Sequence, residues 1–193
     1  MKHIKITIIG CLAALSIACS SCVPAIATYD DTSDMTYPWD TCSQSIGNHP
    51  CDFTLLDQDG KEVSLYSFYG QPIVLDLSAM WCPPCQVAAA DVQATHDEYS
   101  TNNLAYVTVL IETAAGAEPK PEDCKYWADS YGIVDPRVLA ESRDMIDYSS
   151  VNGWNLSSWP TFYFINSEMK LVDEMTGYSK PHLDQKIQEL VSN

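Results

Sequence analysis

Two cysteines three positions apart, Cys82 and Cys85, are the residues best suited to chemistry in this 193-residue chain. They follow an apolar run at 72–78 and open a helical pattern at 83–99. A cysteine at a helix N-terminus is favoured as a thiolate, because the helix dipole and the free backbone N–H groups stabilise its negative charge. The second cysteine lies about one turn further on, within bonding reach of the first. The spacing predicts disulfide exchange, in which Cys82 attacks a substrate disulfide and Cys85 resolves the mixed disulfide.

A metal site is the first alternative, because zinc sites share the C-x-x-C spacing. Such a site needs a second pair of ligands, and the sequence contains no other C-x-x-C and no paired histidines. We interpret His49, His96 and His182 as scattered surface residues. The sequence therefore predicts neither a bound metal nor a cofactor.

Two further functions compete for the same cysteines. A copper(I)-binding chaperone stays open as an alternative, because thiolates are soft ligands and Met80 is a nearby third candidate. A thiol peroxidase is disfavoured, since it needs a Pro-x-x-x-Thr/Ser-x-x-Cys setting that residues 76–80 do not supply.

The elements that must position the cysteines alternate along residues 51–193. A continuous apolar run predicts a buried strand, and apolar residues at helical spacing predict an amphipathic helix. In the helix that follows Cys82 we expect Val87, Ala88 and Val92 to point inward. Predicted strands are 51–56, 61–65, 72–78, 104–111, 137–140, 162–165 and 171–175; predicted helices are 83–99, 122–131, 142–150 and 181–191. This order predicts an α/β fold, with a mixed central sheet flanked by helices and an N-terminal β-hairpin.

The first 27 residues predict a signal peptide, because two lysines precede the uncharged apolar run 6–18. That run is too short to cross a bilayer about 30 Å thick as a helix. Ala18-Cys19-Ser20-Ser21 resembles a bacterial lipobox, in which Cys19 carries a lipid, whereas Ala25-Ile26-Ala27 resembles an ordinary cleavage site. Cleavage at the second site and an uncleaved anchor are the alternatives to lipidation. We expect a signal peptide at 1–27, a linker at 28–50 and a thioredoxin-like domain at 51–193.

The predicted leader places the mature protein outside the cytoplasm, where disulfides can persist. Cys42 and Cys51 are expected to form a structural disulfide. The alternative is that they form a second redox pair, which passes electrons to or from Cys85. Cys124 is interpreted as an inert, half-buried thiol, although pairing with Cys22 or with another chain stays open. The formal net charge of −16 argues against nucleic-acid binding, because an acidic surface repels phosphate.

Two motifs carry a resemblance to a known family. Trp81-Cys82-Pro83-Pro84-Cys85 and the later Trp159-Pro160-Thr161-Phe162-Tyr163-Phe164-Ile165 resemble the TlpA/ResA-like, redoxin (AhpC/TSA-type) branch of the thioredoxin superfamily. The resemblance covers residues 51–191 and implies a thioredoxin fold with an N-terminal hairpin and a central insertion at 113–140. It also implies an exported, membrane-anchored thiol–disulfide reductase on the periplasmic side. Its implied partners are exported proteins with disulfides or thiols and a membrane electron donor.

The second motif implies a cis-proline at Pro160 that faces the cysteines. X–Pro bonds are the peptide bonds that adopt cis at little cost, and a cis turn here exposes the backbone of Trp159 to an extended substrate. The alternative is an ordinary proline that starts a strand. The residues implied in substrate binding are Trp81, Pro83, Pro84, Trp159 and Thr161.

Asp76 is an acid within an otherwise apolar strand, six residues before Cys82. It matches the buried acid of ordinary thioredoxins, which moves a proton to or from the second cysteine. Desolvation should raise the pKa of this carboxyl and make it a proton acceptor for Cys85. A hydrogen-bonded structural acid is the alternative.

Overall fold

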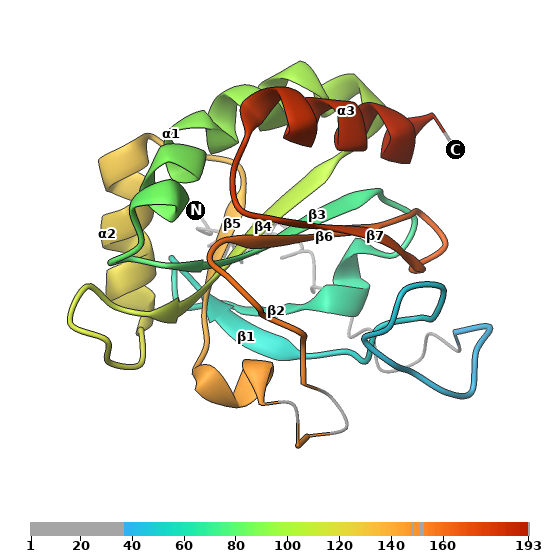
Figure 1. The fold of residues 1–193 in the computed structure, drawn as a ribbon, viewed down its shortest axis with the longest axis horizontal. Coiled ribbons are helices and arrows are strands. Elements are labelled where there is room, and N and C mark those ends of the chain that lie inside the picture. The colour runs from blue at the N-terminus through green and yellow to red at the C-terminus, as the bar shows by residue number, and fades with distance from the viewer. Residues whose placement is uncertain (1–36, 148, 151–152, 193) are drawn as a thin grey trace, which may run out of the picture. The chain divides into compact units, whose positions relative to one another are not determined.

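The computed structural model describes residues 37–147, 149–150 and 153–192, which form a seven-stranded mixed sheet with three α-helices (Figure 1). The strand order is β2-β1-β5-β4-β3-β6-β7. Strands β3, β4 and β5 are parallel, and the strands on either side of them are antiparallel. The predicted fold class is confirmed. The predicted leader, including Cys19, and the first part of the predicted linker lie outside the described residues.

The bounds of the elements follow the sequence pattern closely. The strands are β1 (Thr54–Asp57), β2 (Glu62–Ser64), β3 (Ile73–Ala79), β4 (Ala105–Glu112), β5 (Arg137–Ala140), β6 (Thr161–Ile165) and β7 (Leu171–Thr176). The helices are α1 (Pro83–Glu98), α2 (Pro121–Tyr131) and α3 (Lys180–Val191), and short 3-10 turns are η2 (Leu65–Phe68), η3 (Ser100–Asn102) and η4 (Arg143–Ile146). Within the described residues, no helix is long and apolar enough to cross a membrane.

The central strands explain where the helices lie. Every residue of β3 and β4 is buried, which is typical of strands covered on both faces. The β3–α1–β4 and β4–α2–β5 connections step across the sheet in the same direction. Because such crossovers are right-handed, both helices lie on one face of the sheet. Helix α3 packs beside α1 on that face (Figure 1).

The two faces of the sheet bury separate clusters. The helix-side cluster contains Cys82, which precedes α1, and Cys85 and Val92 within α1. Trp127 from α2 and Ile187 from α3 belong to the same cluster. The opposite cluster is covered by shorter elements, including η2, η4 and the loop around Trp154. The cysteine pair therefore belongs to the helix-side layer.

Two predictions about individual elements are wrong. Val87 is 57% exposed, because the inward stripe of α1 runs through Cys85, Ala88, Ala89, Val92 and Thr95. The predicted helix at 142–150 is only the short turn η4, in which Ser142 caps the backbone N–H of Asp144.

The described part of the predicted linker packs against the domain, which the sequence pattern did not predict. Trp39 stacks on His49 with ring centroids 4.0 Å apart and donates a hydrogen bond of 3.1 Å to the Tyr66 hydroxyl. His49 is thus half-buried rather than a free surface residue. A disulfide joins Cys42 to Cys51 beside these rings. Aromatic packing and a covalent bridge together hold this segment on the domain.

Candidate active site

The cysteine pair lies at the junction of β3 and α1. Cys82 is the N-cap residue of α1, and its Sγ accepts a hydrogen bond of 3.3 Å from the backbone N–H of Cys85. Pro83 and Pro84 occupy the first turn, where a missing N–H leaves no hydrogen bond unmade. The two cysteines form a disulfide with their Cα atoms 5.2 Å apart. Cys82 is 2% exposed and Cys85 is completely buried, so the disulfide is almost closed to solvent.

The second motif lies next to this junction. The Trp159–Pro160 peptide bond is cis, and Thr161 begins β6 directly opposite Leu77 of β3. The Trp81 and Trp159 rings meet edge to face with centroids 6.0 Å apart. Two segments 78 residues apart in sequence therefore converge around Cys82. Of the residues implied in substrate binding, Trp81, Pro83 and Pro84 are exposed, Trp159 is half-buried and Thr161 is buried.

Asp76 lies on the helix-facing side of β3, two residues from Val74 of the cysteine cluster. It is 1% exposed, and its carboxyl accepts hydrogen bonds from the Ser78 hydroxyl (2.6 Å) and the Thr108 hydroxyl (3.5 Å). Burial raises the pKa of this carboxyl to about 7, while the two hydroxyls lower it. In the described part of the chain, no lysine or arginine forms an ion pair with it. Asp76 can therefore change its protonation state near neutral pH.

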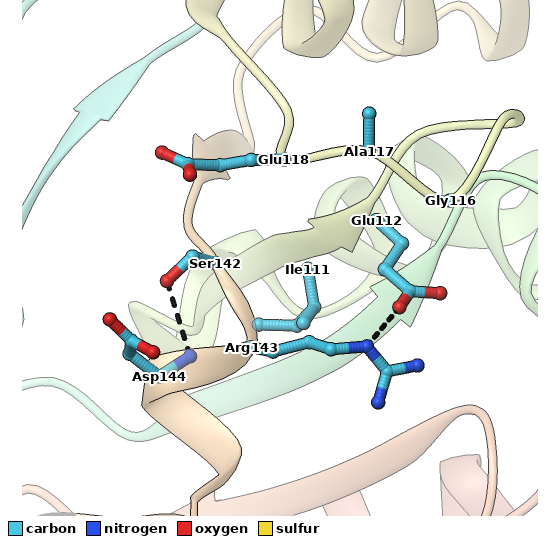
Figure 2. A pocket seen from close by; sticks show the side chains of 8 residues that line it. All are labelled: Ile111, Glu112, Gly116, Ala117, Glu118, Ser142, Arg143 and Asp144. Atoms are coloured by element: carbon cyan, nitrogen blue, oxygen red, sulfur yellow. Dashed lines mark hydrogen bonds and ion pairs between the residues drawn. The ribbon is translucent and has the colours of Figure 1, made fainter.

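Sequence reasoning missed a second buried acid, Glu112, at the end of β4. Its carboxylate accepts a hydrogen bond of 2.6 Å from the Trp81 indole and is paired with the Arg143 guanidinium (Figure 2). Its backbone carbonyl accepts a hydrogen bond of 2.9 Å from the N–H of Met80. Glu112 thus fixes the two residues that precede Cys82. The available signal was an acid at the end of a buried strand parallel to β3, since such strands end at the same edge of the sheet.

A pocket of about 260 Å³ opens beside Glu112. Its walls come from two segments, the loop after β4 and the turn η4, which face each other across the opening (Figure 2). The residues that line it are Ile111, Glu112, Gly116, Ala117, Glu118, Ser142, Arg143 and Asp144. The Glu112 side chain lines the pocket and also accepts the hydrogen bond from the Trp81 indole, so it connects the pocket to Trp81.

The remaining cysteine in the described residues, Cys124, is free and lies inside α2. It is fully buried rather than half-buried, and burial together with nearby acids, Asp123 foremost, raises the pKa of its thiol to about 12. A thiol with this pKa has almost no thiolate at neutral pH. Cys22 lies outside the described residues.

One group of potential metal ligands comes together within the described residues. A ring nitrogen of His96 and carboxylate oxygens of Asp97 and Asp135 all lie within 4.8 Å of one another. No metal-ligand spacing is visible in the sequence, because Asp135 follows α2 whereas the other two residues lie near the end of α1. The group lies toward the end of α1 that is opposite to Cys82.

Comparison with known proteins decides the family. The model of the AhpC/TSA family matches residues 46–174, a range that includes both motifs. The chain belongs to this family. It is 27% identical over 142 residues to the thioredoxin-like protein YneN of Bacillus subtilis, covering 73% of this chain and 78% of that protein. It is also 27% identical over 135 residues to the thiol-disulfide oxidoreductase ResA of Bacillus subtilis, covering 70% and 69%.

Solved structures agree with this family membership. A protein from Chlorobium tepidum described as a thiol:disulfide interchange protein DsbE matches with a TM-score of 0.61 at 20% identity, over 76% of this chain and 98% of that one. The exposed lipoprotein thioredoxin Etrx1 of Streptococcus pneumoniae matches with a TM-score of 0.59 at 27% identity, over 72% of this chain and all of that one. The chain thus has a thioredoxin fold and is a thiol–disulfide oxidoreductase.

Proposed function

We propose that this protein is an exported reductase of protein disulfides that works through Cys82 and Cys85. The observation that carries the proposal is the position of the pair, with Cys82 as the N-cap of α1 and Cys85 buried beneath it. In the reduced protein, the Cys82 thiolate attacks one sulfur of a substrate disulfide and forms a mixed disulfide, releasing the other sulfur as a thiolate. Cys85 then attacks Cys82 Sγ, which releases the reduced substrate and leaves the disulfide seen in the structure.

The resolving step requires Cys85 to lose its proton in a buried site. Asp76 lies in the same layer of the molecule and has a pKa of about 7, so we assign it as the proton acceptor. We place an extended substrate segment against the backbone at Trp159, as the resemblance of residues 159–165 implies. The exposed residues Trp81, Pro83 and Pro84 are proposed to contact the same segment, together with Thr161.

We propose that electrons flow from Cys82 and Cys85 to the substrate, because the TlpA/ResA-like resemblance of residues 81–85 and 159–165 implies a reductase. A membrane electron donor then restores the dithiol. The reduction potential of the cysteine pair is the quantity that sets this direction.

Export and anchoring complete the proposal. Cys19, which follows the apolar run 6–18, is proposed as the lipid attachment site. One similar protein, the pneumococcal Etrx1, is described as an exposed lipoprotein. Mass spectrometry of the mature N-terminus tests this point, since a chain that begins at Thr28 contradicts lipidation.

The decisive experiment for the exchange reaction compares two variants. Cys82→Ser should abolish reduction of insulin, whereas Cys85→Ser should accumulate a mixed disulfide because the resolving thiol is missing. Equilibration with a thiol redox buffer should give a reduction potential below about −200 mV, on the reducing side of protein disulfide isomerase at about −180 mV. A potential near that of DsbA, about −120 mV, would contradict the reductase assignment. Retained insulin reduction by Cys82→Ser would contradict the mechanism itself.

A further inference from the structure

We propose that the pocket beside Glu112 binds a lysine or arginine side chain of the substrate, next to its disulfide. This proposal rests on the proposed function and names the class of polypeptide that the enzyme reduces. The ligand is a basic side chain because two carboxylates in the pocket lining, those of Glu118 and Asp144, form no ion pair within the described residues.

The charges of the pocket are not balanced. The Arg143 guanidinium is paired with the buried Glu112 carboxylate, so these two charges compensate each other. Glu118 and Asp144 are exposed, and neither carboxylate forms an ion pair within the described residues. They stand on the two facing walls of the pocket, Glu118 on the loop after β4 and Asp144 on η4 (Figure 2). The pocket therefore carries a net negative charge.

The shape of the pocket suits a long basic side chain. Ala117 is exposed and lines the pocket, so its methyl group can contact the methylene groups of such a side chain, while Glu118 and Asp144 on the facing walls can meet its charged end. Lysine and arginine behave in this way at surfaces, with the stem on apolar atoms and the charge among polar groups. A volume of about 260 Å³ leaves room for one such side chain.

The position of the pocket ties it to the reaction. Glu112 lines the pocket and also holds the indole of Trp81, the residue directly before Cys82. A substrate segment bound across Cys82 is extended and advances about 3.3 Å per residue. A basic residue within three positions of the substrate cysteine is therefore the one that we expect to enter the pocket.

The test uses peptide disulfides that differ at one position. Lysine, norleucine or glutamate is placed at each of the three positions on either side of the cysteine, and the rate constant of reduction by the reduced protein is measured. At low ionic strength, the lysine peptide should be reduced about fivefold faster than the norleucine peptide at one or two of these positions. Two solvent-exposed ion pairs can account for a difference of this size. The preference should fade at high salt, because exposed charges are screened.

Two double variants test whether the preference for lysine arises in the pocket. The double variant Glu118→Gln/Asp144→Asn should lose the preference for lysine while reducing the norleucine peptide at the wild-type rate. A matched control, Glu62→Gln/Glu168→Gln, removes the same charge from exposed positions outside the pocket and should keep the preference. Loss of the preference in both double variants would assign it to the overall charge and overturn the pocket.

The outcomes separate this proposal from the proposed function. Equal rates for all three peptide types, or faster reduction of the glutamate peptides, would overturn the basic-residue pocket while leaving disulfide reduction intact. Failure to reduce any of the peptides, with insulin also unreduced, would instead contradict the reductase function.

Discussion

Two buried carboxyl groups on adjacent strands have opposite surroundings. Asp76 lies in the middle of β3 and contacts two neutral hydroxyls, those of Ser78 and Thr108. Glu112 lies at the end of β4 and contacts an indole N–H and the guanidinium of Arg143. Both residues are less than a tenth exposed, so burial alone does not distinguish them.

The difference lies in the partners. A carboxylate that meets no cation inside a protein is costly, and its pKa rises until the neutral form is accessible at pH 7. A carboxylate that meets a guanidinium has its charge compensated and serves as a fixed acceptor. One buried acid is therefore suited to moving a proton, and the other to holding Trp81 in place.

The largest expected effect concerns the kinetics of Asp76→Asn. Resolution of the mixed disulfide should slow by about 10²–10⁴-fold, the usual contribution of a general base. Formation of the mixed disulfide should change little, because it needs only the Cys82 thiolate. Stopped-flow measurements with a quenched peptide disulfide separate the two steps. Equal resolution rates for both proteins between pH 6 and 8 would reduce Asp76 to a structural acid.

The same variant should change stability in a pH-dependent way. The folded-state pKa of Asp76 is about 7 and the unfolded value is 3.8, so between these values the native state binds more protons. The free energy of unfolding of the wild type therefore falls as pH rises from about 4 to about 7. Asp76→Asn should be more stable by up to about 4 kcal/mol at pH 8 and nearly equal to the wild type at pH 4. Urea unfolding of the oxidised proteins at both pH values measures this, and a gain that does not depend on pH would contradict it.

Removing one or the other partner of the Glu112–Arg143 ion pair should lower the free energy of unfolding by different amounts. Arg143→Gln leaves a buried carboxylate without its cation and should cost about 1–3 kcal/mol of stability. Glu112→Gln releases a guanidinium whose side chain is 65% exposed, and it keeps an acceptor for the Trp81 indole, so its cost should be smaller. Unfolding of both variants and of the double variant at pH 8 tests this order. The reverse order would show that Arg143 does not compensate the buried charge.

The smallest expected effect concerns access to Cys82. Trp159 packs against the cluster that contains this cysteine, which is 2% exposed. Trp159→Thr should therefore raise the alkylation rate of Cys82 in the reduced protein several-fold. Val87→Ala, on the exposed side of α1, is the control and should leave the rate unchanged. An unchanged rate in Trp159→Thr would mean that another group covers the thiol.

The elements that could be predicted were those with a strong local pattern. The buried strand before the cysteines was expected at 72–78 and runs from Ile73 to Ala79, while β5 has the expected bounds. Val87 was misplaced because apolar character alone did not reveal that the small residue Ala89 takes the inward position instead. The 142–150 segment has too few apolar residues at helical spacing to sustain more than η4. The aromatic residues Tyr37 and Trp39 show no periodicity, so their packing could not be anticipated.

The sequence by itself determined the chemistry that depends on neighbours along the chain. Two cysteines three apart after a buried strand must lie at the first turn of the following helix, and Asp76 must point to one face of its strand. Only the tertiary structure decided which distant residues meet them. Glu112 reaches Trp81 across 31 positions, and the pocket joins two segments that the crossover of α2 separates. A pattern of apolar residues reports which side of an element is buried, whereas the partner on that side depends on strand order and register.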